Sequence, residues 1–369
     1  MKILYAFPEP FPLERARGVQ VAHSTAELAR QGVDVELFHV PGIAADPLQY
    51  YGIVKPPSLM LMPLSRSLPW PLSRIHSNRL FLQRFERHLN ASAEAIVLVR
   101  HLKLASLLLE RHPDCRLVYE AHEVFSDTAA PEKRAAHFAM EARVMQRAAL
   151  VLANSAATAQ RLKDLHGERP VEVLHNGVDW PERFPDKDWA HAAQHIIYAG
   201  SFFAWKGVSD LVLASNVLPG CRITLLGGSA EQVAREQSRA SGIGAQIEFK
   251  GHTAHAEVAN ALAQACIAVL PNRDDPDSRF TSPIKLFEYM AAGCAVVASD
   301  LPALRDVLAD DEAIWVKAGD PADLAAGIRR LVDDPVRAAG MGRRVHDKAR
   351  EHTWQARAVK LLALLRTIE

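Results

Sequence analysis

The sequence predicts an α/β protein made of two doubly wound domains, each a parallel sheet covered by helices on both faces. Three observations lead to this fold class. The chain has 369 residues, and two cores of roughly 180 residues each suit that length better than one core does. Apolar runs rich in Val, Ile and Leu alternate with longer stretches of helical period, which is typical of parallel strands buried on both faces. A polar segment with two prolines, residues 176–194, divides these runs into two series and predicts an interdomain linker.

The strands of each series are separated by helical patterns. The first series of predicted strands covers residues 2–7, 33–38, 95–99, 116–120, 149–154 and 171–174. The second series covers residues 195–200, 222–227, 246–251, 267–270, 294–299 and 313–316. Amphipathic helices fill the gaps, as in residues 21–32 and 256–265, where apolar positions recur at helical spacing. Strand and helix alternate along the whole chain, and this order favours parallel sheets.

Charge and cysteine content exclude several classes of protein. Lys and Arg together number 43, as do Asp and Glu, so no nucleic acid or acidic polymer is expected as a partner. The four cysteines stand far apart, without a CxxC pair or a neighbouring histidine cluster, which indicates free thiols in a reducing compartment and no metal site. The first residues enter a strand pattern at once, and no apolar run approaches the ~20 residues of a membrane span. We therefore expect a cytoplasmic protein.

Ligands of doubly wound sheets bind beyond the carboxyl ends of the strands, so the loops at those ends hold the candidate site. After the first strand, a proline-rich loop reaches Gly18 as a helix begins. A glycine there lets a ligand approach the backbone, and the unpaired N–H groups of a helix start favour an anion. A plain turn glycine is the alternative, because the loop lacks the GxGxxG pattern.

A second loop follows the strand predicted at residues 195–200. That strand ends at Gly200, and Lys206 and Gly207 open the next helix. A lysine at a helix N-terminus opposes the helix dipole, so the arrangement favours an anion, such as a phosphate, between them. The alternative is a solvated surface lysine.

A third loop leads into a helix that carries one glutamate among apolar residues. Ser282 suits an N-cap, and Pro283 suits the first helical position. Glu288 lies about one turn further on, where a partly buried carboxylate is costly unless it is hydrogen bonded. Paired hydroxyl groups of a ligand would supply bonds to both of its oxygens. The alternative is a structural glutamate bonded to the backbone or to a neighbouring arginine.

Taken together, these stretches resemble glycosyltransferase family 4, whose members are retaining enzymes of GT-B architecture, with two Rossmann-like domains facing across a cleft. The resemblance covers nearly the whole chain. The stretches that carry it are RGVQVAHSTAELARQGVDVELF, EAHEVF, HNGVD, YAGSFFAWKGV and SPIKLFEYMAAGCAVVASD, which begin at residues 17, 120, 175, 198 and 282. Their combination is specific, although no single stretch is.

The resemblance implies a domain organisation and an activity. Residues 1–178 would bind the acceptor, residues 179–352 would bind the nucleotide sugar, and residues 353–369 would form a helix that crosses back to the N-terminal domain. The implied enzyme is a hexosyltransferase that moves a sugar from a UDP- or GDP-sugar to a carbohydrate or lipid-linked acceptor, in the synthesis of cell-surface polysaccharide or glycoconjugate. No cofactor and no metal ion is implied, since cationic groups take the place of a metal. The DxD spacing within residues 274–277 is interpreted as a solvated turn.

The functional residues of the family carry over position by position. Glu288 matches the glutamate that holds the donor ribose, Lys206 the lysine that binds the diphosphate, and His122 the histidine beside the donor sugar. These three are the implied catalytic residues. Gly18 matches the glycine near the donor phosphate, and backbone N–H groups around 282–284 would face the phosphates and the sugar. The residues implied for donor binding are Gly18, Gly200, Ser201, Lys206, Arg279, Ser282, Pro283, Ile284 and Glu288.

Two departures from the family pattern bear on activity. Phe280 stands where the commonest form has a glutamate, and Ser201 stands where an arginine is frequent. Arg273 or Arg279 could supply the missing charge, and a weak or inactive member stays open. Two other functions also stay open. One is a nucleotide-sugar 2-epimerase of the same architecture, which would need an acid/base cluster at the cleft; the other is a non-catalytic GT-B partner subunit.

Residues 64–88 carry five arginines and one glutamate among Leu, Trp, Ile and Phe. Such a segment could lie on an anionic membrane surface and meet a lipid-linked acceptor, which would place the protein peripherally at the inner face of the membrane. The alternative is an ordinary amphipathic helix that packs on the N-terminal sheet and keeps a solvated basic face.

Overall fold

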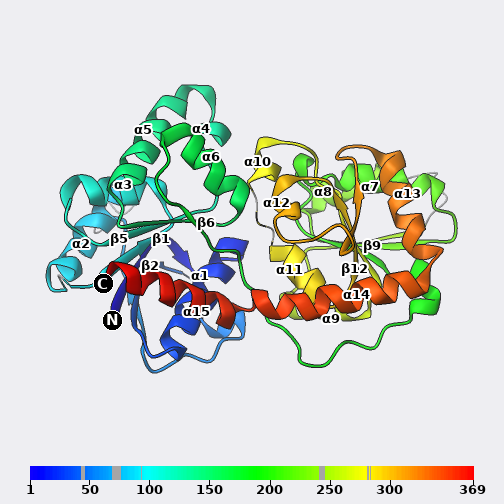
Figure 1. Cartoon of the computed structure of the whole chain (residues 1–369), viewed down its shortest axis with the longest axis horizontal. Helices are drawn as coiled ribbons and strands as arrows, with labels where there is room; N and C mark the ends of the chain where they lie inside the picture. Colours follow the sequence, from blue (N-terminus) through cyan, green and yellow to red (C-terminus); the bar gives the residue numbers. More distant parts are fainter. Residues whose placement is uncertain (43–45, 69–75, 93, 241–245, 281, 283) are drawn as a thin grey trace. The chain divides into compact units, whose positions relative to one another are not determined.

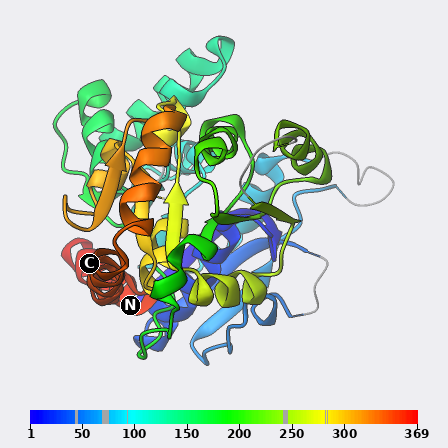
Figure 2. The same ribbon diagram turned by 90° about the vertical axis from the view of Figure 1, so that its right-hand side faces the viewer.

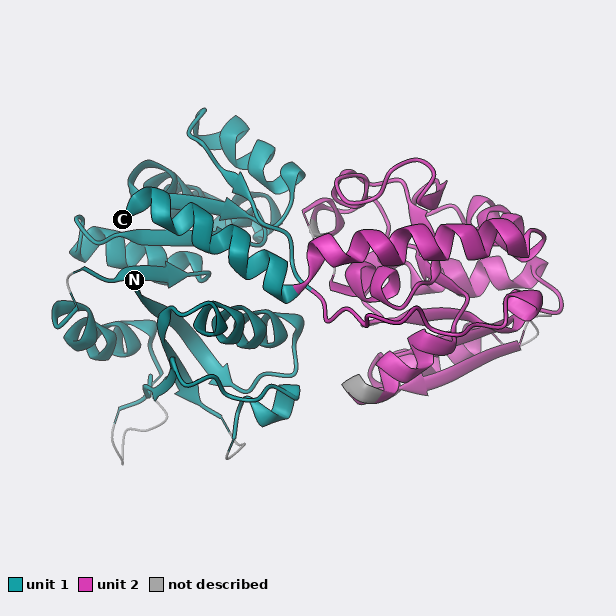
Figure 3. Cartoon of the chain, turned by 60° about the horizontal axis from the view of Figure 1, so that its bottom comes forward, with its two compact units in different colours: residues 1–177, 354–369 teal, residues 178–353 magenta. Residues whose placement is uncertain are grey.

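The computed structural model describes residues 1–42, 46–68, 76–92, 94–240, 246–280, 282 and 284–369. These residues form two compact units, which Figure 3 shows in different colours. Unit 1 comprises Met1–Gly177 and Trp354–Glu369, and unit 2 comprises Val178–Thr353. Each unit has its own parallel sheet and its own hydrophobic core.

Unit 1 is built on a seven-stranded parallel sheet of order β3-β2-β1-β4-β5-β6-β7. Its strands are β1 (Lys2–Phe11), β2 (Asp34–Pro41), β3 (Leu59–Pro63), β4 (Ile96–Val99), β5 (Leu117–Ala121), β6 (Leu150–Ala153) and β7 (Glu172–Val173). Side chains on both faces of β1 are buried over most of its length, as expected for a central strand covered by helices on both sides. The chain runs from β1 outward to β3 and then returns to β4, so the strand order reverses between β1 and β4.

Helices cover both faces of this sheet. They are α1 (Ala16–Arg30), α2 (Asn78–Asn90), α3 (Leu102–Arg111), α4 (Phe125–Thr128), α5 (Pro131–Arg147), α6 (Ala156–His166) and α15 (Trp354–Leu365). On one face, Tyr5 of β1 shares a core with α1 and with Leu361 and Leu365 of α15. On the other face, Phe85 of α2 packs edge-on against Phe38 of β2, with ring centroids 5.0 Å apart. The last helix, red in Figure 1, is therefore part of the core of unit 1.

Unit 2 is built on a six-stranded parallel sheet of order β10-β9-β8-β11-β12-β13. Its strands are β8 (Ile196–Ala199), β9 (Arg222–Leu226), β10 (Gln246–Gly251), β11 (Ile267–Leu270), β12 (Ala295–Ser299) and β13 (Ala313–Val316). Its helices are α7 (Val208–Ala214), α8 (Ala230–Ala240), α9 (His255–Gln264), α10 (Pro276–Arg279), α11 (Ile284–Ala291), α12 (Pro302–Arg305), α13 (Pro321–Val332) and α14 (Pro335–Ala349). Figure 2 gives a second view, in which helices flank the strands of this unit.

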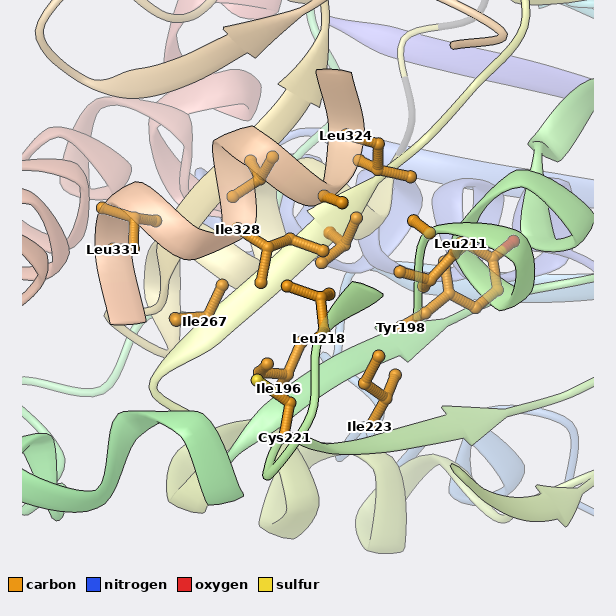
Figure 4. Close-up of a cluster of buried hydrophobic side chains, with 14 of the residues drawn as sticks. Ile196, Tyr198, Leu211, Leu218, Cys221, Ile223, Ile267, Leu324, Ile328 and Leu331 are labelled. Carbon is orange, nitrogen blue, oxygen red and sulfur yellow. The ribbon is translucent and has the colours of Figure 1, made fainter. Parts of the chain in front are cut away.

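Successive residues of the central strands of unit 2 point to opposite faces and enter separate cores. Val297 of β12 joins the cluster that α7 and α13 cover, and Figure 4 shows Leu211 and Leu324 from these helices against the sheet. Val296, its neighbour, joins a second cluster with α9, α11 and α14. Because both faces are buried, the strands read as continuous apolar runs in the sequence.

The predicted fold class is confirmed, because both units are parallel, doubly wound sheets with helices on both faces. Every predicted strand is present, with limits that differ by a few residues. The sequence prediction missed β3, whose residues read LMLMP. This edge strand is short, contains no β-branched residue and ends in proline, so it lacks the signals of a strand.

The polar segment at residues 176–194 lies almost wholly within unit 2, and is therefore not a free linker. Its polar groups find partners there. The ammonium of Lys187 is buried and donates to the carbonyl oxygens of Leu262 and Ala263, at 2.9 and 3.1 Å. These carbonyls belong to the end of α9, where a cation is favoured by the helix dipole.

The strand order of each sheet reverses once in a way that positions loops for a ligand. In unit 1 the reversal lies between β1 and β4, and in unit 2 it lies between β8 and β11. At such a point, the connections from the two neighbouring strands leave toward opposite faces, which opens a crevice at the carboxyl ends. The loop that leads to Gly18 follows β1, and the loop with Lys206 follows β8, so both loops lie where this fold binds ligands.

Candidate active site

The loop that follows β8 holds Gly200 and Ser201 and is fixed by two tyrosine hydroxyls. The hydroxyl of Tyr289, from α11, accepts a hydrogen bond from the backbone N–H of Ala199 at 2.7 Å and donates to its carbonyl at 3.3 Å. Tyr198 donates to the carbonyl of Ser201 at 2.7 Å. A buried tyrosine hydroxyl needs such partners, and these bonds fasten α11 to the end of β8.

Lys206 ends a short 3-10 turn, Ala204–Lys206, and does not open α7 as the sequence predicted. Gly207 separates the turn from α7 with a φ of 68°, a conformation that favours glycine. A side chain at that position would also lie 1.7 Å from the carbonyl oxygen of Pro271. The ammonium of Lys206 lies 3.9 Å from the ring centroid of Trp205, so the turn holds this cation at the carboxyl end of β8.

Glu288 lies on α11 with 12% of its side chain exposed. The ammonium of Lys285 donates to Oε2 of Glu288 at 2.7 Å. The structural partner of the glutamate is therefore a lysine one turn earlier, whereas the sequence alternative named the backbone or an arginine. The spacing of three residues was the signal for Lys285, since such pairs share one side of a helix.

The two arginines considered for the missing phosphate charge both pair with carboxylates. Arg273 binds Asp210 in a bidentate pair, with Nε and Nη2 at 2.7 and 2.6 Å from its oxygens. Asp210 is buried in the first turn of α7, so this pair ties the segment after β11 to that helix. Arg279 binds Asp274 at 2.7 and 3.1 Å, and both are about half exposed.

The start of α11 is only partly described. Phe280, at the position of the family's glutamate, is buried at 8% exposure, so this side chain fills apolar space. Ser282 is buried, and Ile284 is the first residue of α11 and is partly buried. Pro283 lies outside the described residues, so its predicted place at the helix start is not described.

The acidic stretch at residues 274–277 is not an open turn throughout, because Pro276–Arg279 form the single-turn helix α10. Asp274 pairs with Arg279. Across the ranges that the structure describes, no group of three or more His, Cys, Asp or Glu side chains is arranged to hold a metal ion. The cysteines are free thiols, three of them buried.

Gly18 lies in the first turn of α1, where the preceding loop folds back onto the helix. A side chain at this position would lie 2.3 Å from the carbonyl oxygen of Leu13 and 2.5 Å from the hydroxyl of Tyr51. Tyr51 holds that loop, because its hydroxyl accepts from the Leu13 N–H at 2.6 Å and donates to the Leu13 carbonyl at 2.8 Å. Packing within unit 1 therefore requires a glycine here, whatever the ligand.

His122 lies at the carboxyl end of β5 beside a buried carboxylate. Its Nε2 is 3.2 Å from Oε1 of Glu120, and 16% of its side chain is exposed. Glu120 accepts hydrogen bonds from Nε2 of Gln20 of α1, at 3.0 and 3.2 Å. Arg357 of α15 forms an ion pair with the same carboxylate and donates from Nε to the carbonyl of His175 at 3.0 Å. Three segments, α1, β5 and α15, thus meet at one carboxylate.

Burial and neighbouring charges set the protonation of this cluster. Burial, followed by the charge of Arg100, lowers the pKa of His122 from 6.5 to about 4, although Glu120 opposes the shift. Burial alone raises the pKa of the Glu120 carboxyl, but the charge of Arg357 leads the opposing interactions, and the pKa lies well below its usual range. At neutral pH the imidazole is therefore neutral and the carboxylate is ionised.

The structure gathers the predicted site residues into two groups, one in each unit. Gly18 and His122 belong to unit 1, and the remaining described residues belong to unit 2. The sequence prediction missed Lys285, Tyr289, Glu120 and Arg357. The signal for Glu120 was the alternation of side chains along a strand: Glu120 and His122 are two residues apart, and such residues point to the same face. Nothing local indicated Arg357, because it reaches the cluster from the last helix.

The described part of residues 64–88 includes most of α2, whose apolar side packs within unit 1. Phe81, Leu82 and Phe85 of α2 are fully buried in unit 1, while Arg79 and Arg87 are exposed. The apolar side of this helix is therefore covered by its own unit, and residues 69–75 lie outside the described residues. Among the described helices, none has the length and apolar character needed to cross a membrane.

Two family models match the chain, one for each unit. The model described as "Glycosyltransferase Family 4" matches residues 18–180, and the model described as "Glycosyl transferases group 1" matches residues 193–334. Among curated proteins, D-inositol 3-phosphate glycosyltransferase 1 of Catenulispora acidiphila is 29% identical over 266 residues, which cover 65% of this chain and 62% of that protein. The matched segments span 54% to 62% of the length of the first curated relatives.

Solved structures share the fold over the whole chain. Sucrose-phosphate synthase from Thermosynechococcus elongatus has a TM-score of 0.80 at 18% identity, covering 100% of this chain and 99% of that one. HepE of Anabaena, solved in complex with UDP-glucose, has a TM-score of 0.75 at 15% identity, with 100% of both chains covered. These likenesses establish the fold, and the two family models add the family. The chain belongs to the family 4 glycosyltransferases.

Proposed function

We propose that this protein is a retaining hexosyltransferase that moves a sugar from a UDP- or GDP-sugar to a glycan or lipid-linked acceptor, without a bound metal ion or cofactor. Family membership supports this proposal, as do the names of relatives such as D-inositol 3-phosphate glycosyltransferase 1 and the UDP-glucose complex of HepE. The proposed setting is the synthesis of cell-surface polysaccharide or glycoconjugate, in the cytoplasm or at the inner face of the membrane.

One observation carries the proposal. The hydroxyl of Tyr289 binds both backbone polar groups of Ala199, so α11 is fastened to the strand end that leads into the loop of Lys206. Glu288 precedes Tyr289 on the same helix, and 12% of its side chain is exposed. We infer that α11 thereby brings the Glu288 carboxylate toward the strand end that leads to Lys206, as a ligand with hydroxyl groups and a diphosphate requires.

The proposed roles follow from these charges. Glu288 accepts hydrogen bonds from the ribose hydroxyls of the donor, and Lys206 binds the diphosphate. During transfer, the bond from the anomeric carbon to the β-phosphate oxygen breaks, a bond to the acceptor oxygen forms, and the hydroxyl proton passes to the departing phosphate. Negative charge grows on that phosphate, and a cation that is already in place stabilises it.

His122 has a different part in the proposal. Because its imidazole is neutral at pH 7, it can exchange hydrogen bonds with a hydroxyl of the donor sugar without adding charge. Oε1 of Glu120 lies 3.2 Å from Nε2 of this ring. A neutral imidazole positions the sugar, and its loss would lower transfer more than it lowers nucleotide binding.

The test is an incubation with a panel of UDP- and GDP-sugars, with and without candidate acceptors. We expect a glycosylated product only when acceptor is present, with the anomeric configuration of the donor retained in its NMR spectrum. Activity should persist in EDTA, and titrations with UDP and GDP should identify the donor base. Isomerised donor without acceptor would mean an epimerase, and no reaction with any donor would mean a non-catalytic subunit.

A further inference from the structure

Unit 1 contains a polar pocket near the carboxyl ends of β3 and β4. It has a volume of about 360 Å³ and is lined by Arg66, His76, Ser77, Asn78, Arg79 and Lys103. Arg66 follows β3, Arg79 is in the first turn of α2, and Lys103 is in the first turn of α3. Three cationic side chains from three segments therefore surround one hollow, which also contains polar groups of Ser77 and Asn78.

The positive charge of this pocket is not balanced by carboxylates. Among the residues that the structure describes, Arg66, Arg79 and Lys103 form no ion pair, and the lining contains no acidic residue. Glu9, whose charge reaches the neighbouring His101, is itself paired with Arg17 at 2.5 Å. Three cations gathered in this way repel one another unless an anion lies between them.

A hollow in unit 2 gives the contrast. Its lining includes three arginines, Arg235, Arg239 and Arg273. There, Arg235 and Arg239 lie 3.5 and 2.8 Å from oxygens of Glu236, and Arg273 is paired with Asp210. Both hollows are therefore lined by cations. In unit 2 these cations are paired with carboxylates, whereas in unit 1 no carboxylate among the described residues pairs with them.

The frame of the unit 1 pocket is held by hydrogen bonds. The N–H of Ser77 donates to the carbonyl of Arg66 at 2.9 Å, and Nη2 of Arg84 donates to the carbonyl of Ser67 at 3.0 Å. Oγ of Ser67 is 2.7 Å from Nδ1 of His76. These bonds fix the segment after β3, which carries Arg66, to the start of α2, which carries Arg79.

We infer that this pocket binds a phosphate or phosphodiester group carried by the acceptor. Two arginines and a lysine provide charge-assisted hydrogen bonds, the strongest that a phosphate makes with protein side chains. The N-terminus of α2 adds little to phosphate binding, because Oγ of Ser77 already accepts a hydrogen bond from the backbone N–H of Arg79. That the phosphate belongs to an acceptor rests on the proposed function, whereas the binding of a phosphate by this pocket does not. The phosphate belongs either to a soluble phosphate ester or to a lipid headgroup.

Two probes test the inference: inorganic phosphate followed by calorimetry or 31P NMR, and vesicles of phosphatidylglycerol compared with phosphatidylcholine. The variants are Arg79→Gln and Lys103→Gln, whose side chains are exposed and can be changed without disturbing the core. The matched control is Arg87→Gln, an exposed arginine on the same helix outside the pocket. Each pocket variant should bind its probe about tenfold more weakly, the effect of one lost charge-assisted bond.

The two probes separate the sources of the phosphate. If the pocket variants weaken binding of inorganic phosphate but bind vesicles like the control, the ligand is a soluble phosphate ester. If they lose binding to phosphatidylglycerol vesicles while Arg87→Gln retains it, the ligand is a headgroup. The inference is wrong if the wild type binds neither probe, or if Arg87→Gln loses as much as the pocket variants.

The same proteins separate this inference from the proposed function, because UDP and GDP titrations report on unit 2. Phosphate binding that depends on the pocket, in a protein that transfers no sugar, would contradict the proposed function alone. Sugar transfer by a wild type whose phosphate binding is indifferent to Arg79 and Lys103 would contradict this inference alone.

Discussion

The charged residues of the two units differ in how deeply they are buried and in what holds them. In unit 1, Glu120 and Arg357 are 1% and 4% exposed and pair across 237 positions of the chain. In unit 2, Glu288 and Lys285 are 12% and 30% exposed and pair within one turn of a helix. The first pair exists only when α15 is packed on the sheet, whereas the second can form in any stretch of helix.

This difference determines which residues can be tested for function separately from folding. When one partner of a buried ion pair is removed, the other is left as an uncompensated charge in the core. Activity and stability are then lost together. A local pair that reaches solvent contributes little to stability, so a change there reports contacts with ligand.

The largest effect is expected for Arg357→Met. The substitution leaves Glu120 buried without its cation, and it also removes the donor to the carbonyl of His175. We expect the free energy of unfolding to fall by about 3 to 5 kcal/mol, measured by urea denaturation. UDP or GDP binding should persist wherever the protein remains folded.

The matched control is Lys360→Met, which removes an exposed cation from the same helix and should change stability by less than about 0.5 kcal/mol. Equal stabilities of the Arg357 and Lys360 variants would show that the pair with Glu120 is not what holds α15. The comparison between the two units would then lose its basis.

Acid should destabilise unit 1 through the same cluster. The pKa of His122 is 6.5 in an unfolded chain and about 4 in this structure, so between these pH values the unfolded state binds a proton that the folded state does not. Stability therefore falls as the pH is lowered through this window. Below this window, stability continues to fall because the pKa of Glu120 is lower in the folded state than in the unfolded state. As the pH drops, the carboxyl of the unfolded chain therefore binds a proton before that of the folded chain does.

The variant His122→Gln tests the contribution of the histidine to this pH dependence. Its free energy of unfolding should depend less on pH between 6.5 and about 4, while the decline at lower pH, caused by Glu120, should remain. A wild-type slope that the variant reproduces would mean that other groups cause the acid sensitivity.

The comparison also shows what the sequence can predict. The strands of both sheets were predictable because burial on two faces leaves continuous apolar runs, and β3 was missed because an edge strand needs no such run. Lys206 and Glu288 were recognised from stretches at two strand ends, where the order of elements already indicates a ligand site.

The remainder depends on contacts that only the folded chain makes. Arg357 meets Glu120 because α15 packs against the unit 1 sheet, and no local pattern relates two residues so far apart. Gly18 shows the reverse case. It looked like a ligand-approach glycine, yet Leu13 and Tyr51 already leave no space for a side chain, so its sequence signal cannot separate packing from binding.

The next effect concerns ligand contacts in unit 2. Glu288→Ala should weaken nucleotide binding by about 3 kcal/mol, the value for two lost bonds to a charged acceptor, and should abolish most transfer. The melting temperature should change little, since the pair with Lys285 reaches solvent. The control Glu351→Ala removes an exposed carboxylate of the same unit. An early-melting Glu288 variant would instead make this glutamate structural, like Glu120.

The smallest effect is expected for Lys206→Ala. Its ammonium lies over the ring of Trp205, a contact worth about 0.5 to 1 kcal/mol at an exposed site, so folding should be almost unaffected. Loss of one charge-assisted bond should weaken UDP or GDP binding by about 1 to 3 kcal/mol, and the nucleoside without phosphates should bind as before. The control is Lys317→Ala, whose side chain is 79% exposed. If titration finds the diphosphate affinity unchanged, Lys206 is not in the site, and the phosphates of the donor must be held by backbone N–H groups or by a cation elsewhere in unit 2.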